Sequence, residues 1–279
     1  MVGLIYYCIG YTGYISTLNW DGVSPTQQHV GFANYTQLFH DPVFWDAIRH
    51  TVYFFVVTFS VQTAVGFTFA ALLHSKIKLA NLYKVIIFIP VVLAPATMAP
   101  IFRQVFSATG QFNTVLQDLG LGSLAHPWLA QSSTALPVIM AITVWEWTGV
   151  TFILYFAAMT QIDKEILEAA RIDGAGEFRT FFVISSRLLA PGIVTVVLFT
   201  VVATWNNYFL PLIMLSTPNW YPLTVGLNTW NMQAATAGGQ TVYNLVITGS
   251  LLTVIPIMAA FLYLQRYWRS GLATGSVKG

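Results

Sequence analysis

Six runs of predominantly apolar residues divide the chain. They cover about residues 2–17, 51–73, 82–101, 135–158, 188–210 and 242–264. A spanning helix needs about 20 apolar residues, and the strict apolar–polar alternation of a membrane β-barrel is absent. Lipid offers backbone groups no hydrogen-bond partners, so each run is predicted to be a helix. The pattern predicts an all-α membrane protein of about six transmembrane helices, with residues 1–279 forming a single transmembrane domain.

The first run differs from the other five. It is short, contains glycines and begins directly at Met1, so we expect either a short first span or an incomplete start of the chain. It has neither the basic residues nor the small-residue cleavage site of a signal peptide. A five-span alternative places residues 1–17 at the membrane interface.

Composition supports the membrane assignment. Charged residues make up 8% of the chain, against about 25% in soluble domains. There is no basic run of the kind that binds nucleic acid, so no nucleic-acid partner is expected. The single cysteine, Cys8, cannot form an internal disulfide, and the scattered histidines suggest no metal site.

The distribution of Lys and Arg predicts the orientation. Ten of the twelve basic residues follow the second, fourth and sixth runs, whereas Arg49 and Arg103 fall on the opposite side. Because positive residues accumulate on the cytoplasmic side, these two loops and the C-terminus are predicted to be cytoplasmic. The six-span pattern also places the N-terminus there, whereas the five-span alternative places it outside.

Three outer segments connect the spans. Residues 18–48 are rich in aromatic residues and are predicted to lie along the outer membrane surface, with Asp41-Pro42 starting a helix. Residues 102–134 and 211–241 are predicted to be outer loops. Within the spans, Gly66 and Gly149 are predicted to permit close helix approach.

One polar segment interrupts this apolar chain. Residues 161–187 hold nine of the 22 charged residues. Helical spacing over 162–172, the Asp173-Gly174 break and a possible second helix from Glu177 to Ser185 predict two short cytoplasmic helices. Five acidic and four basic residues give no attraction to anionic lipid, so a protein partner is favoured over an amphipathic hairpin lying on lipid headgroups.

The sequence "EAARIDGAGEFRTFFVISSRLLAPG" resembles the EAA loop of permease subunits of binding-protein-dependent ABC importers. The matching positions are Glu168-Ala169-Ala170, Asp173-Gly174-Ala175, Phe181, Ile184 and Pro191. Ser186-Arg187 stands where that family usually has Leu-Pro. The segments "WDGVSPTQQHVGFANYTQLFHDPVFWDAI", "TWNNYFLPLIMLSTPNWYPLTVGL" and "QRYWRSGLATGSVKG" are similar to the carbohydrate-uptake branch.

The resemblance implies a type I ABC importer permease fold, multi-pass in the cytoplasmic membrane of a bacterium or archaeon. It implies a second permease subunit, two ATPase subunits, an extracellular or periplasmic substrate-binding protein and a sugar substrate, with membrane lipid around the spans. The EAA coupling helix would dock on an ATPase through Glu168, Ala169, Ala170, Arg171, Asp173, Gly174, Ala175 and Phe181.

The chain has no G-x-x-x-x-G-K-[ST] sequence for cradling ATP phosphates. No cofactor is therefore expected on this chain, and ATP and Mg would be used by the partner ATPase. No nucleophile–base combination is apparent, so no catalytic site is predicted.

Candidates for the substrate pathway are polar or aromatic residues inside the spans. An intramembrane acid such as Glu146 costs a few kcal/mol unless it meets water or a partner. Glu146 either accepts hydrogen bonds from the hydroxyl groups of a sugar, with Trp145 or Trp147 stacking on the ring, or joins a hydrogen-bond network between helices. The same two interpretations, pathway lining or helix–helix contact, apply to Trp205, Asn206, Asn207 and Tyr208.

An external loop around residues 231–239 is polar and small-residued, and we expect Asn231, Gly238 and Gly239 to contact the binding protein. A disordered loop is the alternative. For the whole chain, the competing hypothesis is an ion-gradient-driven secondary transporter of a small polar solute. That class predicts internal repeats with broken helices and more buried ionisable groups.

Overall fold

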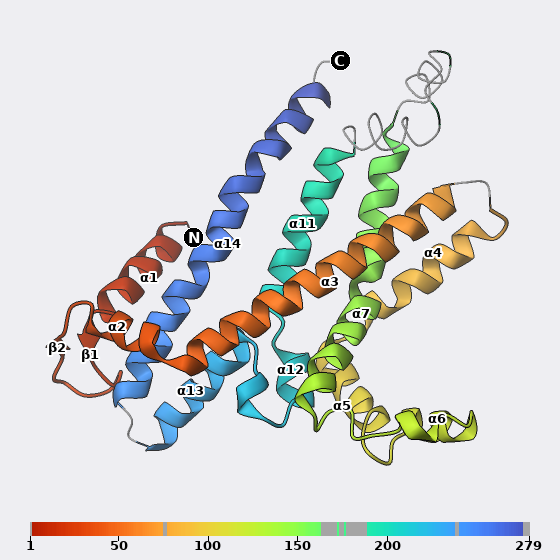
Figure 1. The fold of residues 1–279 in the computed structure, drawn as a ribbon. Helices are drawn as coiled ribbons and strands as arrows, with labels where there is room; N and C mark the ends of the chain where they lie inside the picture. Colours follow the sequence, from red (N-terminus) through yellow and green to blue (C-terminus); the bar gives the residue numbers. More distant parts are fainter. Residues whose placement is uncertain are drawn as a thin grey trace. The chain divides into compact units, whose positions relative to one another are not determined.

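The computed structural model describes residues 2–74, 77–162, 172, 176, 189–237 and 240–275. They form two compact units. Unit 1 comprises Met1–Phe54, Ala99–Leu136 and Trp205–Ala259, and unit 2 comprises Phe55–Met98, Pro137–Thr204 and Ala260–Gly279. Several long helices, among them α3, α7 and α14, contribute residues to both units (Figure 1).

The helices confirm an all-α membrane fold. Four segments are long and apolar enough to cross a membrane, and a fifth qualifies if one bent helix pair counts as a single span. The four segments are Pro42–His74 in α3, Ser132–Thr160 in α7, Gly192–Met214 in α11 and α12, and Tyr243–Gln265 in α14. They overlap the predicted runs 51–73, 135–158, 188–210 and 242–264. Helix α14 as a whole extends over Gln240–Gly275.

The first predicted span coincides with a shorter helix. Helix α1 covers Val2–Ile15. Its 14 residues rise about 21 Å, less than the ~30 Å of a bilayer's hydrocarbon core. Among the described residues, four helices, or five with the bent pair, are therefore long and apolar enough to span, against about six predicted.

The third predicted run, 82–101, is not a straight helix. Helix α4 (Ala80–Phe88) continues into the 3-10 turn η1 (Ile89–Val92), and α5 (Pro95–Val105) then leaves at 94° to it. The bend can be followed in Figure 1. Pro90 and Pro95 explain it, because proline lacks the N–H that a continuous helix needs and restricts the residue before it.

The fifth predicted run is also divided. Helix α11 (Ala190–Trp205) ends before residues 206–208, and the short helix α12 (Phe209–Met214) follows. Asn206 and Asn207, predicted to lie inside a helical span, instead lie in this break. Asparagine side chains compete for backbone hydrogen bonds, and Pro211 cannot continue a preceding helix, so the sequence favours a break here.

The outer segments contain more helix than predicted. Residues 18–48 form a two-stranded antiparallel pair, β1 (Leu18–Asn19) with β2 (Gln28–His29), followed by α2 (Ala33–His40). Residues 102–134 include α6 (Gln111–Asp118) and the turn η2 (Gly122–Leu124). Residues 211–241 include the turn η4 (Pro218–Trp220) and α13 (Leu223–Ala237). Both segments that were predicted to be outer loops thus contain helices.

The predicted start of α3 is confirmed. Helix α3 begins at Pro42, and the Val43 backbone N–H donates to Asp41 Oδ1 at 2.8 Å. A carboxylate in this position satisfies one of the N–H groups that have no partner inside the helix.

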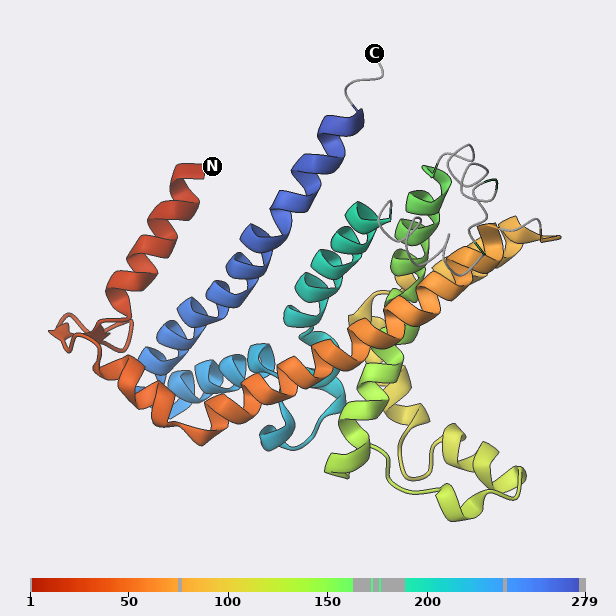
Figure 2. The ribbon, with the colours of Figure 1, turned by 45° about the horizontal axis from the view of Figure 1, so that its top comes forward.

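Unit 1 is organised around the Leu38 cluster, in which α2, the start of α3, α13 and the first turns of α14 meet. In both views α13 lies beside the first turns of α14 (Figure 2). The buried members of this cluster are Leu38, Phe44, Ala47, Leu223, Leu227 and Leu245. Thr51 adds a polar contact, since its Oγ1 accepts the Leu223 N–H at 2.9 Å at the start of α13.

Unit 2 is organised around the Phe152 cluster, which joins α3, α7 and the start of α11. Its buried members are Ala70, Leu73, Phe152, Tyr155, Met159, Leu189 and Val196. Two glycines let the helices approach closely, as predicted. A Cβ on Gly66 would lie 2.8 Å from Thr151 Cγ2, and one on Gly149 would lie 2.7 Å from the Ile87 carbonyl oxygen of α4. Small residues at such crossings allow backbone-level packing in membranes.

Candidate functional site

Helix α7 is the most enclosed of the candidate spans. In the 18-residue apolar stretch of this helix 61% of the residues are buried, against 22–28% in the corresponding stretches of the other three segments. Glu146 is one of the buried residues and is 3% exposed. A central helix that carries polar side chains is the part of the fold most suited to line a pathway.

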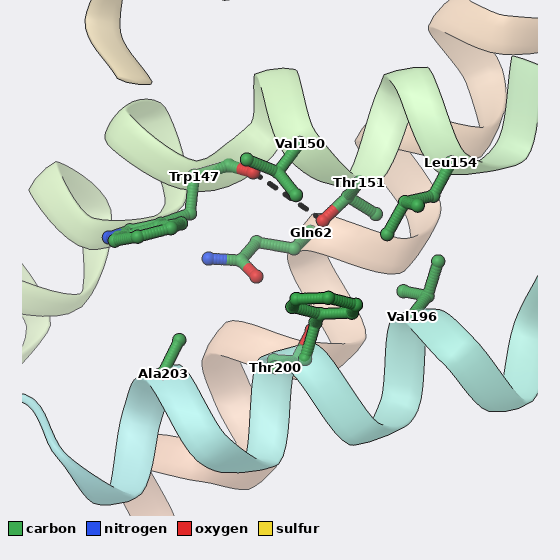
Figure 3. A pocket seen from close by; sticks show the side chains of 9 residues that line it. Gln62, Trp147, Val150, Thr151, Leu154, Val196, Thr200 and Ala203 are labelled. Atoms are coloured by element: carbon green, nitrogen blue, oxygen red, sulfur yellow. Dashed lines mark hydrogen bonds between the residues drawn. The ribbon is translucent and has the colours of Figure 1, made fainter. Parts of the chain in front are cut away.

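A small cavity lies in unit 2 between α3, α7 and α11 (Figure 3). Its volume is about 40 Å³. That is enough for an ordered water molecule and far below the roughly 300–1,000 Å³ of small-molecule pockets. In this conformation the cavity cannot accommodate a sugar. The lining residues are Gln62, Trp147, Val150, Thr151, Leu154, Val196, Phe199, Thr200 and Ala203.

Gln62 is the main polar group of this cavity. Its side chain comes from α3 and points between Trp147 of α7 and Thr200 of α11 (Figure 3). The amide Nε2 donates to the Thr143 carbonyl at 3.3 Å. Near it, Thr58 and Thr204 hydroxyls approach to 3.4 Å. The α3–α7–α11 contact is therefore a strip of amide and hydroxyl groups within apolar helices, a chemistry suited to a neutral, hydroxyl-rich solute.

The predicted group around Glu146 is only partly brought to this cavity. Trp147 lines the cavity, and its side chain hydrogen-bonds the Glu146 carboxylate. Glu146 is not among the lining residues, and Trp145 is 44% exposed. Glu146 is thus buried beside an indole of its own helix, and Trp147 is the residue of the predicted group that reaches the cavity.

The second predicted pathway group belongs to unit 1. Trp205 packs against the Leu38 cluster. Asn206, Asn207 and Tyr208 form the break between α11 and α12. The Asn207 carbonyl accepts the Thr224 hydroxyl at 3.0 Å, which ties this break to α13. Non-helical backbone at membrane depth is tolerated where protein or water satisfies its polar groups.

Sequence reasoning did not identify Gln62, Thr151 and Thr200 as candidates. Each is a polar residue inside a strongly apolar run, so the signal was present. It was weaker than that of Glu146, because an amide or hydroxyl in a helix can satisfy itself locally. The Thr151 hydroxyl, for example, donates to the Trp147 carbonyl at 3.5 Å (Figure 3).

A polar hub organises the segment between α5 and α7 in unit 1. Asn113 is 3% exposed. Its Nδ2 donates to the carbonyls of Ser107 (3.3 Å), Ala108 (3.0 Å) and His126 (3.0 Å), and its Oδ1 accepts the Trp128 indole N–H at 2.7 Å. The Asn113 side-chain amide therefore links residues 107–108 to residues 126–128.

Replacing Asn113 with alanine is expected to loosen residues 107–128 and to destabilise unit 1 by about 1–3 kcal/mol, since buried polar groups lose their partners. Hydrogen exchange across residues 107–128 and the melting temperature in detergent test this. Gln117→Ala on the exposed face of the same helix is the matched control. Equal exchange rates in the two variants would contradict the role of the hub.

Two asparagine contacts tie the N-terminal segment to α14 in unit 1. Asn244 is buried and its Oδ1 accepts the Trp20 backbone N–H at 3.0 Å, while its Nδ2 donates to Asn19 Oδ1 at 2.8 Å. The exposed turn that follows is closed by Asp21, whose pKa is lowered to about 2 by hydrogen bonds from the Ser24 hydroxyl and from the Ser24 and Val23 N–H groups.

The predicted coupling residues lie outside the described residues. This applies to Glu168, Ala169, Ala170, Arg171, Asp173, Gly174, Ala175 and Phe181. The chain on either side is described: Ile162 packs against the Phe152 cluster, and Leu189 is one of its buried members. Both ends of the polar segment are thus fixed on one core, which also includes the end of α3.

The predicted binding-protein contact is partly described. Asn231 is exposed and lies in α13, so residues 231–237 are helical rather than part of a loop. Gly238 and Gly239 lie outside the described residues.

Comparison with known proteins agrees with this architecture. The family described as "Binding-protein-dependent transport system inner membrane component" matches residues 62–270. The diacetylchitobiose uptake system permease protein NgcF of Streptomyces coelicolor is 30% identical over 261 residues, which is 88% of this chain and 73% of that protein. The lactose transport system permease protein LacF of Rhizobium radiobacter is 34% identical over 175 residues, which is 62% of this chain and 57% of that protein.

A further relative is the probable ABC transporter permease protein YurN of Bacillus subtilis, 34% identical over 181 residues, 64% of this chain and 62% of that protein. The chain thus spans less than two thirds of the length of YurN and of LacF. Among solved structures, a chain of a bacterial ABC transporter involved in the import of the acidic polysaccharide alginate has a TM-score of 0.75. It is 17% identical to this chain, and the match covers 97% of this chain and 93% of that one.

The fold is therefore that of a type I importer permease. The chain belongs to the family of inner membrane components of binding-protein-dependent transport systems, because the family match extends over most of its length. The similarity to permease proteins named for lactose and diacetylchitobiose confirms the resemblance to carbohydrate-uptake permeases.

Proposed function

We propose that the chain is the transmembrane subunit of an ATP-driven sugar importer in a bacterial or archaeal cytoplasmic membrane, with its C-terminus in the cytoplasm. The observation that carries this proposal is the family match over residues 62–270, which includes the polar segment 161–187. The relatives named for lactose and diacetylchitobiose support a carbohydrate substrate.

The partners follow from this role. A second permease completes the pathway, two ATPases hydrolyse ATP with Mg, one of them docks on the 161–187 segment, and an external binding protein delivers the sugar. The chain itself has no catalytic role in this scheme. The buried strip of Gln62, Thr143 and Thr200 supports a hydroxyl-rich substrate, since amides and hydroxyls offer both donors and acceptors.

An ion-gradient-driven transporter is not favoured. Among the described residues of unit 2, Glu146 is the one acidic side chain, whereas proton- and sodium-coupled carriers use chains of ionisable groups. Purification of the tagged chain tests the choice. Recovery of an ATPase, with uptake that follows ATP and not a proton or sodium gradient, is the expected result. Recovery without an ATPase and with gradient-driven uptake would favour the carrier.

Substitutions in the two predicted pathway groups test the substrate route. We expect Glu146→Gln to lower uptake about tenfold or more, because a hydrogen bond to a charged group contributes about 1.5–3 kcal/mol, and Asn207→Ala to lower it a few-fold. Complex assembly, measured by copurification, should be unchanged. Thr68→Ala, on the exposed face of α3, is the control. Normal uptake in both variants would remove these residues from the pathway.

A further inference from the structure

The last turns of α7 meet two other helices of unit 2 at one aromatic ring. Phe156 lies one turn before Thr160, where α7 ends and the predicted coupling segment 161–187 begins. The His74 ring at the end of α3 meets the Phe156 ring edge-on, with 6.0 Å between the ring centroids. Lys84 Nζ, from α4, lies 4.0 Å from the centre of the same phenyl ring. We call these three residues the Phe156 clamp, because they join the end of α3, the start of α4 and the end of α7.

A second contact fixes the angle between α4 and α7. Gly149 lies about two turns before Phe156 in α7. A Cβ on Gly149 would lie 2.7 Å from the Ile87 carbonyl oxygen and 3.1 Å from Phe88 Cα, both in α4. The Lys84 and Gly149 contacts follow one another along both helices. Together they therefore resist pivoting of α4 about either one, since closely packed helices move as a unit.

Helix α4 begins in a strained backbone conformation. Leu79, just before it, has φ 63° and ψ 22°, the left-handed region that residues with a Cβ seldom adopt. Among the described residues it is the one non-glycine residue with a positive φ. Its side chain is 68% exposed, so the packing of the neighbouring helices must hold this conformation. Ala80 packs against the Phe152 cluster and Lys84 against Phe156, and these two contacts hold the start of α4 in place.

We propose that His74 and Lys84 are positioning residues for coupling, which act through Phe156 and hold α3 and α4 on the end of α7. A displacement of α7 at Thr160 then carries α3 and α4 with it. Without the clamp the strained start of α4 relaxes, and part of the displacement is lost before it reaches the rest of unit 2. The inference rests on the proposed function, in which the 161–187 segment receives the movement of the ATPase.

The chemistry of the clamp separates it from ordinary packing. An ammonium group is attracted by the face of an aromatic ring, whereas a neutral side chain of similar length is not. Lys84→Met therefore removes this attraction and keeps an unbranched apolar chain, and Lys84→Arg keeps a cation that pairs well with aromatic rings. Phe156→Leu removes the ring and keeps an apolar side chain. If Lys84 served packing alone, Lys84→Met would be tolerated.

The contact is tested first on the purified full-length chain in detergent. Lys84→Met should lower the melting temperature by about 2–4 °C, the shift expected from a cation–π contact in a protein of this size. In the Phe156→Leu background the same substitution should cause little further change, because the partner of Lys84 is gone. Lys84→Arg should keep the wild-type value, and so should the control Lys78→Met, at an exposed lysine before α4. An equal fall in both backgrounds would overturn the contact.

The coupling role is tested in the complex with the ATPases. In a Cys8→Ser background, spin labels on Leu82→Cys and Thr160→Cys, both at exposed positions, report the distance between the start of α4 and the end of α7. With the clamp intact this distance should be the same with and without a non-hydrolysable ATP analogue. In Lys84→Met the distance should lengthen by a few ångströms when the analogue binds, a shift of the size seen when helices slide at interfaces.

The same response to the analogue in both proteins would overturn the coupling role. Failure of any ATPase to copurify would instead count against the proposed function, and the role in coupling would fall with it. The melting temperatures of the Lys84 and Phe156 variants would still measure the contact, so the two failures are distinguishable.

Discussion

Reversing one charge in the polar segment, by Glu168→Lys, is expected to reduce ATP-driven uptake by roughly 30-fold or more while the membrane helices stay folded. Loss of a charged group from a buried contact between proteins costs about 2–5 kcal/mol, and each 1.4 kcal/mol is tenfold. Copurification of the ATPase, ATP hydrolysis and uptake are measured together. A detached ATPase lowers all three, whereas an uncoupled one leaves hydrolysis without uptake.

The structure explains why this effect should be confined to coupling. Ile162, just before the segment, packs against the Phe152 cluster, and Leu189, just after it, is a buried member of that cluster, so we expect the described core of unit 2 to stay packed in the variant. Gly174→Pro provides a second variant, because proline removes an N–H and fixes the backbone at the predicted turn.

Glu177→Lys is the matched control for Glu168→Lys. It makes the same charge change nine residues further along, at a position that is not among those matching the EAA loop. If Glu177→Lys abolishes uptake as fully as Glu168→Lys, the effect comes from net charge rather than from a specific docking contact. Normal copurification and uptake in Glu168→Lys would contradict the coupling role.

The apolar pattern predicted where helices occur but not where they stop. The runs 51–73 and 135–158 fall inside α3 and α7, since about 20 apolar residues give an unambiguous signal. The breaks at residues 206–208 and between Val92 and Pro95 involve two or three residues in strongly apolar surroundings. The prolines and asparagines that cause them were visible, but a long apolar window outweighs so short a signal.

Residues of the candidate site could be predicted where they give a strong sequence signal and not where the signal is weak. A carboxylate in a membrane helix stands out, so Glu146 was identified. Gln62 and Thr200 do not stand out in the sequence. They become candidates only because α3 and α11 meet at α7, which is a feature of the tertiary structure. Helix α13 was missed for a related reason. Its polar, small-residued sequence is typical of a loop, and its helix is held by the Leu38 cluster and by the Thr51 hydroxyl.

The close packing of α4 against α7 in unit 2 predicts a second large effect, on the stability of the protein. Replacing Gly149 with alanine is expected to destabilise the protein by about 1–3 kcal/mol, the usual cost of an overfilled core. The added Cβ would lie 2.7 Å from the Ile87 carbonyl oxygen and 2.8 Å from Val91 Cγ2. The side chain of Val91 could rotate, but the carbonyl belongs to the backbone of α4, so relief requires α4 and α7 to separate.

Gly226→Ala is the control, since the nearest atom to its added Cβ is Ala47 Cβ at 3.8 Å. Both glycines lie inside helices, where alanine by itself stabilises by roughly 0.5–1 kcal/mol. The two substitutions should therefore shift the melting temperature in detergent in opposite directions, down for Gly149→Ala and slightly up for Gly226→Ala. A rise for both would mean that α4 and α7 do not pack at the observed distance. A fall for Gly149→Ala alone identifies the α4–α7 crossing as a fixed contact, and it is the same contact that holds Lys84 over Phe156.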